Sequence, residues 1–311
     1  MTAEGAAARS RLLFVFLDGV GIGEPDPGRN PFLVARLPTL RSLLGGRLPT
    51  SEAPRVAGPD AVAFPLDANL GIGGTPQSGT GQTALLTGRN AARIFGRHFG
   101  PWTPVGLRAL VEEHNVLTRA AAAGRSVAFA NAYPRGWPGP RGGRRVAAPP
   151  LAARAAGVLD RHEEALGEGR AVSSEIVNDG WRAHLGHGWL PVISEEEAGR
   201  NLARIAAEHE LTLYAHYATD TAGHRGGMEG AVRALERVDR FLSGVLEGLP
   251  ADVSLLVTSD HGNVEDVTTQ HTRNPALGVV AGAASRALTP GLADLVDVAP
   301  WVLGRLRVPA S

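Results

Sequence analysis

Short apolar runs alternate along this chain with longer segments of helical periodicity. The apolar runs cover residues 12–17, 126–130, 211–217 and 255–258. Helical segments at about residues 111–123, 195–208 and 228–246 precede the last three of these runs. Strands that are apolar on both faces and are connected through helices are typical of a mostly parallel sheet with helices on both faces. The sequence therefore predicts an α/β fold.

One stretch of the chain departs from this alternation. Residues 134–191 contain Pro-Gly punctuation, an arginine cluster and short helical pieces with Trp181 and Trp189. The clustered arginines are Arg135, Arg141, Arg144 and Arg145. We expect this stretch to form a small inserted lid or cap, carried by a core made of residues 11–133 and 192–308. An elaborated surface loop is the alternative.

The composition excludes several classes of protein. The chain has 311 residues, of which 43% are hydrophobic and 20% charged, and its formal net charge is zero. This balance fits a globular enzyme and gives no electrostatic support for nucleic-acid binding. Cysteine is absent, which excludes disulfides, thiol catalysis and thiolate metal sites. All 31 basic residues are arginine, so a Walker-type phosphate loop and a Schiff-base lysine are excluded as well.

No targeting segment is expected. The first ten residues are small and polar, and the apolar run at 12–17 is shorter than a signal-peptide core of about 7–15 residues. It is also far shorter than the roughly 20 apolar residues of a membrane span. We therefore expect a cytoplasmic protein with no membrane partner.

Acidic residues and histidines follow three of the expected strands. Asp18 comes directly after the first strand, and Asp260 with His261 ends the run at 255–258. The others are Asp220 and His224, just past the run at 211–217, and His271 some ten residues after His261. In an open α/β sheet, ligands bind at the carboxyl ends of the strands. These side chains are therefore expected to meet at one edge.

Three aspartates and three histidines form an oxygen and nitrogen ligand set. Such a set suits Zn²⁺ or Mn²⁺ better than Ca²⁺, which prefers oxygen alone. Six side chains exceed one ordinary site but suffice for two metal ions, an arrangement that stabilises the attacking and leaving oxygens of a phosphoryl group. Taken singly, each aspartate has the alternative of a turn or helix-cap residue, and each histidine that of a hydrogen-bonded bystander.

A candidate nucleophile lies in the glycine-rich stretch 71–88. Its glycines and Pro76 predict a tight loop, and residues 82–87 look like the first turns of a helix. Ser78 or Thr80 would then lie where free backbone N–H groups and the helix dipole favour an anion. A hydroxyl bound to a metal ion there could attack phosphorus. An ordinary Ser/Thr helix cap is the alternative.

The order of these motifs resembles the metalloenzyme core of the alkaline phosphatase superfamily. The motifs are Asp-Gly at Asp18, Ser-x-x-Gly at Ser78, Asp-x-x-Gly-His at Asp220, Ser-Asp-His-Gly-Asn at 259–263 and His-Thr-x-Asn-Pro at 271–275. The branch that this sequence is most similar to holds cofactor-independent phosphoglycerate mutase and phosphopentomutase. The resemblance covers most of the chain outside residues 134–191 and implies an alkaline phosphatase-like core.

The resemblance also implies roles for individual residues. It implies that one metal ion is bound by Asp18, Ser78, Asp260 and His261, and the other by Asp220, His224 and His271. Ser78 corresponds to the nucleophile, with Thr80 as the fallback. The implied cofactors are two divalent metal ions, Mn²⁺ or Zn²⁺.

Substrate contacts are less defined by the sequence. The mutases have histidine after the glycine of Ser-x-x-Gly, whereas this chain has Gln82. The long inserted domain of the phosphoglycerate mutase is also missing. Because a lysine-free chain has only arginine as a permanent cation, we expect Arg97, with the adjacent His98, to bind the substrate anion, and one arginine of 134–191 to reach in on closure.

The expected function is phosphoryl transfer that depends on two metal ions and proceeds through a phosphoserine at Ser78. The enzyme would be a phosphomutase, or a phosphatase or phosphodiesterase, acting on a small phosphorylated metabolite. The alternative is a non-catalytic metal-binding protein that retains the fold. A nucleotide-binding oxidoreductase lacks its Gly-x-Gly-x-x-Gly signature here. The sequence leaves the substrate and the oligomeric state open.

Overall fold

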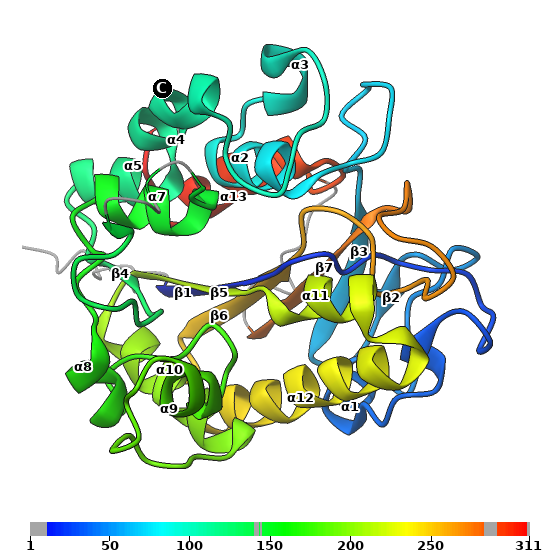
Figure 1. The fold of residues 1–311 in the computed structure, drawn as a ribbon. Coiled ribbons are helices and arrows are strands. Elements are labelled where there is room, and N and C mark those ends of the chain that lie inside the picture. The colour runs from blue at the N-terminus through cyan, green and yellow to red at the C-terminus, as the bar shows by residue number, and fades with distance from the viewer. Residues whose placement is uncertain (1–10, 140–142, 144, 283–290, 310–311) are drawn as a thin grey trace, which may run out of the picture.

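A seven-stranded sheet runs through the computed structural model of the chain, which describes residues 11–139, 143, 145–282 and 291–309 (Figure 1). The strands are β1 (Arg11–Leu17), β2 (Val56–Ala57), β3 (Ala61–Leu66), β4 (Val127–Phe129), β5 (Leu211–His216), β6 (Val253–Thr258) and β7 (Ala276–Ala281). Their order across the sheet is β2-β3-β7-β6-β1-β5-β4. Neighbours from β4 to β6 are parallel, whereas β7 is antiparallel to both β6 and β3. The mostly parallel α/β sheet predicted from the sequence is confirmed.

Strand β1 lies in the interior of the parallel part of this sheet, and its residues are apolar on both faces. It pairs with β5 on one side, where Leu12 lies opposite Leu211 and Leu17 opposite His216. It pairs with β6 on the other, where Phe16 lies opposite Thr258. The ends of β1, β5 and β6 are therefore fixed side by side, which matters for the site described below.

Three strands were not expected from the sequence. Strands β2, β3 and β7 form the antiparallel half of the sheet. Pro65 interrupts the apolar pattern of β3, and Gly278 lies within β7. Both residue types are depleted in strands. Gly278 is needed because an added Cβ would lie 2.3 Å from the ring of Phe64, so it reflects close packing between the two strands.

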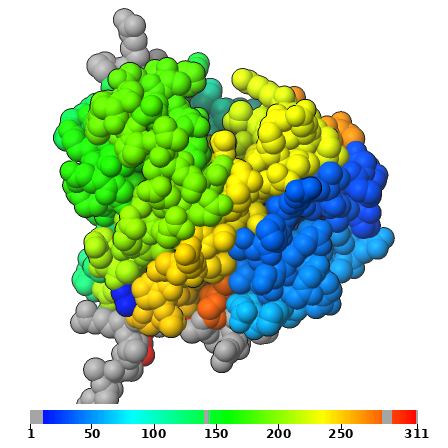
Figure 2. Space-filling model, turned by 90° about the horizontal axis from the view of Figure 1, so that it is seen from below, coloured from blue at the N-terminus to red at the C-terminus, as the bar shows by residue number. Residues whose placement is uncertain are grey.

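Helices cover both faces of the sheet, as Figure 1 shows. One face carries α2 (Ser78–Thr87), α4 (Arg108–His114), α5 (Val116–Ala122), α7 (Ala148–Ala155) and α13 (Leu295–Arg305), and the other carries α1 (Pro38–Leu43), α10 (Glu195–Glu208) and α12 (Gly227–Gly248). Phe14 and Phe16 of β1 pack into the first layer, whereas Leu13 and Val15 pack into the second. Figure 2 shows the second face, with α12 in yellow beside the blue surface of the N-terminal region. The alternation of side chains along one strand thus builds two cores.

The remaining helices are short. They are η1 (Pro31–Leu33), α3 (Ala91–Phe95), η2 (Val105–Leu107), α8 (Glu163–Gly167), α9 (Asp179–His184) and α11 (Ala218–Arg225). Every helix in the described ranges is too short or too polar to cross a lipid bilayer.

The helical segment predicted at about residues 111–123 is divided into two helices, α4 and α5, in the structure. Asn115 has extended backbone dihedrals and ends α4, and its side chain accepts a hydrogen bond from Thr118 N–H to begin α5. An asparagine that caps a helix in this way competes with continuation of the preceding helix. The chain therefore turns between two short helices.

Residues 134–191 contribute to two packing layers. Helix α7 belongs to the main core, because Leu151 and Ala152 are buried among the side chains that surround Phe14. Helices α8 and α9 instead frame a small separate cluster that contains Leu166 and Trp181. The assignment of this stretch as a lid, and the domain boundaries around it, stay predictions.

His216 connects β5 to this stretch from inside the protein. Its side chain is fully buried, and Nδ1–H donates to the carbonyl oxygen of Ser174 at 2.8 Å. Its Nε2 atom has no hydrogen-bond partner in the described part of the chain. Burial lowers the pKa of His216 from 6.5 to about 4. The imidazole is therefore neutral in the folded protein.

His216 should make the metal-free protein sensitive to acid. Its folded pKa lies below its unfolded value, so the stability that the neutral ring contributes is present above pH 6.5 and is lost as the pH falls toward 4. A loss of about 3 kcal/mol is expected over this interval. We predict that urea unfolding of His216→Gln depends less steeply on pH than that of the wild type. The exposed His184→Gln variant is the matched control, and equal slopes for wild type and His216→Gln would contradict the prediction.

Candidate metal centre

The candidate site lies where β1, β5 and β6 end at the same edge of the sheet. Asp18 follows β1, and Asp260 and His261 follow β6. Helix α11 begins directly after β5 and carries Asp220 in its first turn. Because the three strands are parallel neighbours, their carboxyl ends bring these side chains together as expected.

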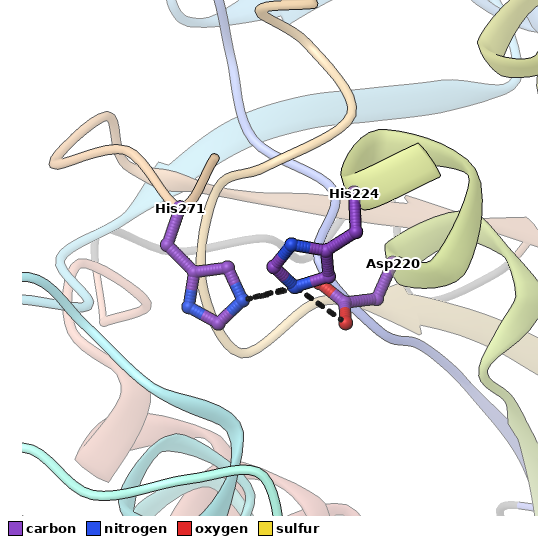
Figure 3. A group of neighbouring side chains, drawn as sticks. All are labelled: Asp220, His224 and His271. Carbon is purple, nitrogen blue, oxygen red and sulfur yellow. Dashed lines mark hydrogen bonds and ion pairs between the residues drawn. The ribbon is translucent and has the colours of Figure 1, made fainter. Parts of the chain in front are cut away.

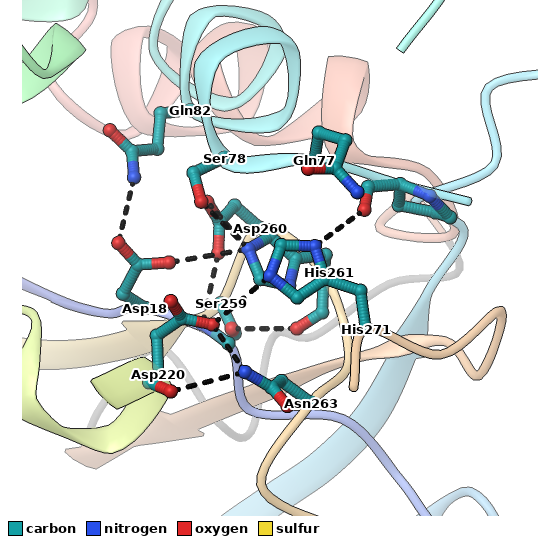
Figure 4. A network of polar contacts seen from close by, with 12 residues as sticks. Asp18, Gln77, Ser78, Gln82, Asp220, Ser259, Asp260, His261, Asn263 and His271 are labelled. Carbon is teal, nitrogen blue, oxygen red and sulfur yellow. Dashed lines mark hydrogen bonds and ion pairs between the residues drawn. The ribbon is translucent and has the colours of Figure 1, made fainter. Parts of the chain in front are cut away.

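The first group of side chains surrounds His261, which is fully buried (Figure 4). His261 Nε2 lies 3.3 Å from Asp18 Oδ1 and 3.8 Å from Asp260 Oδ2. Ser78 Oγ lies 3.0 Å from the same nitrogen. The four residues that the family resemblance assigns to one metal ion are therefore neighbours.

The second group consists of Asp220, His224 and His271 (Figure 3). All three side chains are partly exposed. His224 Nε2 lies 2.9 Å from His271 Nε2 and 3.3 Å from Asp220 Oδ2. His271 Nε2 is also 3.4 Å from Asp220 Oδ1. Ligand atoms of Asp220 lie within 4.8 Å of those of His224 and His271, and equally of those of Asp18 and His261. The Asp220 carboxylate therefore stands between the two groups.

The hydrogen bonds of the histidines fix which ring nitrogens face the centre. Nδ1 of His271 lies 3.0 Å from the carbonyl oxygen of Pro76, and Nδ1 of His261 lies 3.2 Å from that of Gly262. A carbonyl oxygen only accepts, so each Nδ1 donates its proton and each Nε2 faces the centre. In the metal-free protein a proton on His261 Nε2 lets this ring pair with Asp18 and Asp260. With metal ions bound, the Nε2 atoms would present lone pairs to them.

Two buried carboxylates also favour a positive charge at this place. Asp18 Oδ1 and Asp260 Oδ2 have no hydrogen-bond partner among the described residues. A buried charge is tolerated when it is paired or coordinates a metal ion. Carboxylate oxygens and imidazole nitrogens are ligands for divalent transition metals, and metal-bound histidines usually donate their other ring N–H to a carbonyl or carboxylate, as here. The residues present fit two divalent metal ions.

In the metal-free protein, bound protons compensate the negative charge of these buried carboxylates. Burial, together with the charge of Asp18, raises the pKa of Asp260 to about 8. Burial by itself lowers the pKa of His261, but Asp260, Asp18 and Asp220 outweigh it and raise that pKa to about 10. Binding of metal ions at such a group releases these protons.

Close contacts at two glycines allow the site to assemble. Gly19 has a φ of +66°, a conformation that favours glycine, and an added Cβ would lie 2.5 Å from Asp220 Oδ1. An added Cβ at Gly81 would lie 2.7 Å from the carbonyl oxygen of Asp260. Gly81 follows Ser78 by about one helical turn, so the Ser-x-x-Gly spacing lets α2 approach β6 with Ser78 facing the centre.

Thr80, the fallback nucleophile, is occupied elsewhere. Its hydroxyl lies 3.2 Å from the carbonyl oxygen of Gln77 and 3.4 Å from that of Phe99, either of which can accept its proton, and it accepts from Phe99 N–H. Thr80 thereby holds the segment around Phe99 against the start of α2. Helix α2 begins at Ser78, four residues earlier than the sequence indicated, because Gln77 is the N-cap.

Several residues that organise the site were missed by sequence reasoning. Glu265 is fully buried and accepts from Gly21 N–H and Asn263 N–H, and from the side chains of Thr272 and Asn274. Its carboxylate therefore joins the loop after β1 to two stretches of the β6–β7 connection, one of which carries His271. The motifs gave no signal for this role, since Glu265 lies outside them.

Asn263 and Gln82 act on the carboxylates themselves. Asn263 Nδ2 donates to Asp220 Oδ1 at 2.6 Å, and Gln82 Nε2 donates to Asp18 Oδ2 at 3.0 Å (Figure 4). Asn263 is part of the Ser-Asp-His-Gly-Asn motif, so its position was available from the sequence although its partner was not.

Two neighbouring hollows lie next to these side chains. One, of about 410 Å³, is lined by Asp220, His224 and His271 together with Thr75, Gln77, Gly100, Pro101 and Gln270. The other, of about 440 Å³, is lined by Arg97 and His98 and shares Thr75, Gln77 and Gly100 with the first. Arg97 and His98 therefore lie beside the metal centre but not within it.

The arginines of residues 134–191 are engaged in other contacts where the structure describes them. Arg135 forms ion pairs with Glu163 and Glu164, and Arg145 lies 4.9 Å above the ring of Trp102. Arg141 and Arg144 lie outside the described residues. An arginine that reaches in on closure stays a prediction.

Comparison with known proteins agrees with this geometry. Residues 191–309 match the Metalloenzyme superfamily. Over 129 residues, or 38% of this chain, the sequence is 33% identical to the 2,3-bisphosphoglycerate-independent phosphoglycerate mutase of Desulforudis audaxviator and covers 25% of that protein. The chain thus spans about a quarter of the length of the curated relatives it matches.

Solved structures resemble the chain over nearly its whole length. The PH0037 protein of Pyrococcus horikoshii superposes with a TM-score of 0.60 at 14% identity, over 97% of this chain and 98% of that one. Thermus thermophilus alkaline phosphatase superposes with a TM-score of 0.54 at 13% identity, over 98% and 93%. At these identities the likeness concerns the fold.

The resemblance inferred from the motifs is therefore confirmed: residues 191–309 match the Metalloenzyme superfamily, and the fold of the chain is similar to that of an alkaline phosphatase. The relative with the sequence match given above is a 2,3-bisphosphoglycerate-independent phosphoglycerate mutase. The matched residues 191–309 contain five of the candidate ligands, namely Asp220, His224, Asp260, His261 and His271.

Replacing Glu265 should test whether one buried carboxylate holds the loops of the site. In Glu265→Gln, an amide NH₂ replaces an oxygen that now accepts two hydrogen bonds, so donors face donors. We predict a loss of roughly 3 kcal/mol or more in the free energy of unfolding of the metal-free protein, measured in urea. The exposed Glu229→Gln, which removes only an ion pair within α12, should cost less than about 1 kcal/mol. Equal stability of the two variants would contradict the assignment.

Proposed function

We propose that this protein is a metal-dependent phosphoryl-transfer enzyme that acts on a small phosphorylated metabolite through a phosphoserine at Ser78. The observation that carries the proposal is the meeting of Ser78 with two groups of metal-ligand side chains that share Asp220. Matches to phosphoglycerate mutases and the fold of alkaline phosphatases support the same class of reaction.

Two divalent metal ions, Mn²⁺ or Zn²⁺, are the proposed cofactors. Asp18, Ser78, Asp260 and His261 would hold one, and Asp220, His224 and His271 the other. Bound there, the ions would supply Lewis-acid stabilisation of phosphoryl oxygens and lower the pKa of a coordinated hydroxyl.

The protein's own groups prepare Ser78 for attack on phosphorus. Ser78 is the first residue of α2, and in the described part of the chain the N–H groups of Ser78 and Gly79 have no acceptor. These N–H groups and the helix dipole favour a phosphoryl group at this point. As the Ser78 Oγ–P bond forms, the bond from phosphorus to the leaving oxygen breaks, and the Oγ proton passes to a base in the site.

The group that accepts the phosphoryl group from the phosphoserine distinguishes the candidate activities. Transfer back to the substrate makes the enzyme a phosphomutase, whereas transfer to water makes it a phosphatase or phosphodiesterase. Exclusion of water decides between them. The role of residues 134–191 as a lid belongs to this proposal, because such a segment can control water access.

Activity of the metal-loaded protein on phosphomonoesters, phosphodiesters and sugar phosphates tests the proposal directly. Turnover should require Mn²⁺ or Zn²⁺ and disappear after chelation. A protein that binds two equivalents of metal but turns over no substrate in this panel would instead be the non-catalytic metal-binding alternative.

Ser78→Ala should lower kcat by at least about a thousandfold, because the group that forms the covalent intermediate is lost. The fold should be retained, and metal binding by Asp220, His224 and His271 with it. Labelled phosphate from the substrate should be trapped on the wild type by acid quenching and not on the variant.

Thr80→Ala is the matched control for Ser78→Ala. It removes a hydroxyl two residues away on the same helix and should lower stability by about 1–2 kcal/mol while turnover continues. Loss of turnover in Thr80→Ala with retention in Ser78→Ala would move the nucleophile to Thr80. Retention in both would leave attack by a water molecule.

Arg97 and His98 are the proposed contacts to the substrate anion. Arg97 lines the hollow next to the metal centre, and its guanidinium has no carboxylate partner among the described residues. Arg97→Ala should lower kcat/KM by about tenfold or more, the scale of one lost charged hydrogen bond. Arg93→Ala, which removes an exposed arginine of α3, is the matched control. Equal kinetics of both variants would place the anion clamp elsewhere.

A further inference from the structure

Gln82 joins two parts of the protein through one buried amide. It lies on α2, one turn after Ser78, and its side chain is almost fully buried. Its Nε2 donates to Asp18 Oδ2 at 3.0 Å, and its Oε1 accepts from Ala148 N–H at 3.4 Å. The amide thus connects a candidate metal ligand to the start of α7.

The two contacts allow one orientation of the amide. A carboxylate oxygen only accepts and a backbone N–H only donates, so the NH₂ group must face Asp18 and the carbonyl oxygen must face Ala148. Rotating the amide by half a turn would place oxygen against oxygen and NH₂ against N–H. Both the nitrogen and the oxygen of the Gln82 amide are therefore hydrogen-bonded.

The two oxygens of the Asp18 carboxylate have different surroundings because one of them contacts Gln82. Oδ2 is taken by Gln82, whereas Oδ1 lies 3.3 Å from His261 Nε2 and has no hydrogen-bond partner in the described residues. The carboxylate therefore presents a single, oriented oxygen to the centre. Partners that hold a ligand in this way commonly change metal affinity by about 10–100-fold when they are removed.

Gln82 accepts a hydrogen bond from Ala148 N–H, which has no other acceptor among the described residues at the start of α7. Residues 149 and 150 are both proline and have no N–H, and Leu151 N–H bonds to the carbonyl oxygen of Ala147. Ala147, the N-cap, offers no side-chain acceptor. Gln82 therefore acts as the missing cap of a helix that is packed in the main core.

We propose that Gln82 is a positioning residue that fixes the Asp18 carboxylate for its metal ion and ties it to α7. The inference rests on the proposed metal-dependent function. It assigns a role to the position at which this chain departs from the histidine of the mutases it resembles. Metal affinity at the Asp18 group and the order of the first turn of α7 then depend on the same amide.

Titration of chelator-stripped protein with Mn²⁺ by calorimetry tests this role without any substrate. Gln82→Met keeps the length of the side chain and removes both hydrogen bonds. We expect one of the two Mn²⁺ equivalents to bind about 10–100-fold more weakly and the other to remain within about threefold of the wild type. Hydrogen exchange at Ala148 should become faster in the same variant.

Thr83→Val is the matched control, because Thr83 is buried on the same helix and its hydroxyl donates to the carbonyl oxygen of Gly79. It should bind both Mn²⁺ equivalents as the wild type does. Gln82→His, whose ring carries one donor and one acceptor, should recover part of the lost affinity, and it keeps the test decisive if the methionine variant does not fold.

The outcomes separate this inference from the proposed function. Wild-type Mn²⁺ affinity in both Gln82 variants would overturn the positioning role and leave phosphoryl transfer untouched. A wild-type protein that binds two equivalents and loses one in Gln82→Met, but turns over no phosphoester, would overturn the proposed function and support the positioning role.

Discussion

Two buried aspartates determine how this protein must be built around its site. Asp18 and Asp260 each accept a hydrogen bond at one oxygen, from the Gln82 amide and the Gly19 N–H, and turn the other oxygen toward His261 Nε2. Two like charges in a low-dielectric interior repel each other and lose hydration, so they persist only where a positive charge compensates them. Protons on Asp260 and His261 compensate the charge in the metal-free protein, and the same oxygens and nitrogens fit divalent metal ions.

The candidate ligands at this edge of the sheet are oriented by hydrogen bonds to the groups that surround them. Asn263 holds Asp220, Gln82 holds Asp18, and backbone carbonyls hold the rings of His261 and His271. Glu265 lies further from the centre and accepts hydrogen bonds from the loop after β1 and from the β6–β7 connection. Ligands held from behind in this way lose little entropy on binding a metal ion, which makes the site preorganised.

Distant parts of the chain contribute to one candidate site because β1 lies between β5 and β6 in the sheet. Residues 191–309, which match the Metalloenzyme superfamily, supply five candidate ligands. Asp18 and Ser78 come from the N-terminal part of the chain, directly after β1 and at the start of α2. Parallel pairing of β1 with both β5 and β6 places Asp18 between the two later groups, so the site exists only in the folded chain.

The sequence by itself determined the α/β class, the central strands and the residues that meet at their ends. Continuous apolar runs and the period of helices are local properties, and a strand end fixes where Asp18 or Asp260 must lie. Only the tertiary structure decided which side chains hold these ligands. The partners of Asp18 and Asp220 lie 64 and 43 residues away in the chain, and no local pattern records such pairing. The antiparallel strands β3 and β7 were hidden for a related reason: Pro65 and Gly278 weaken their local strand signal, and packing between Phe64 and Gly278 compensates for it.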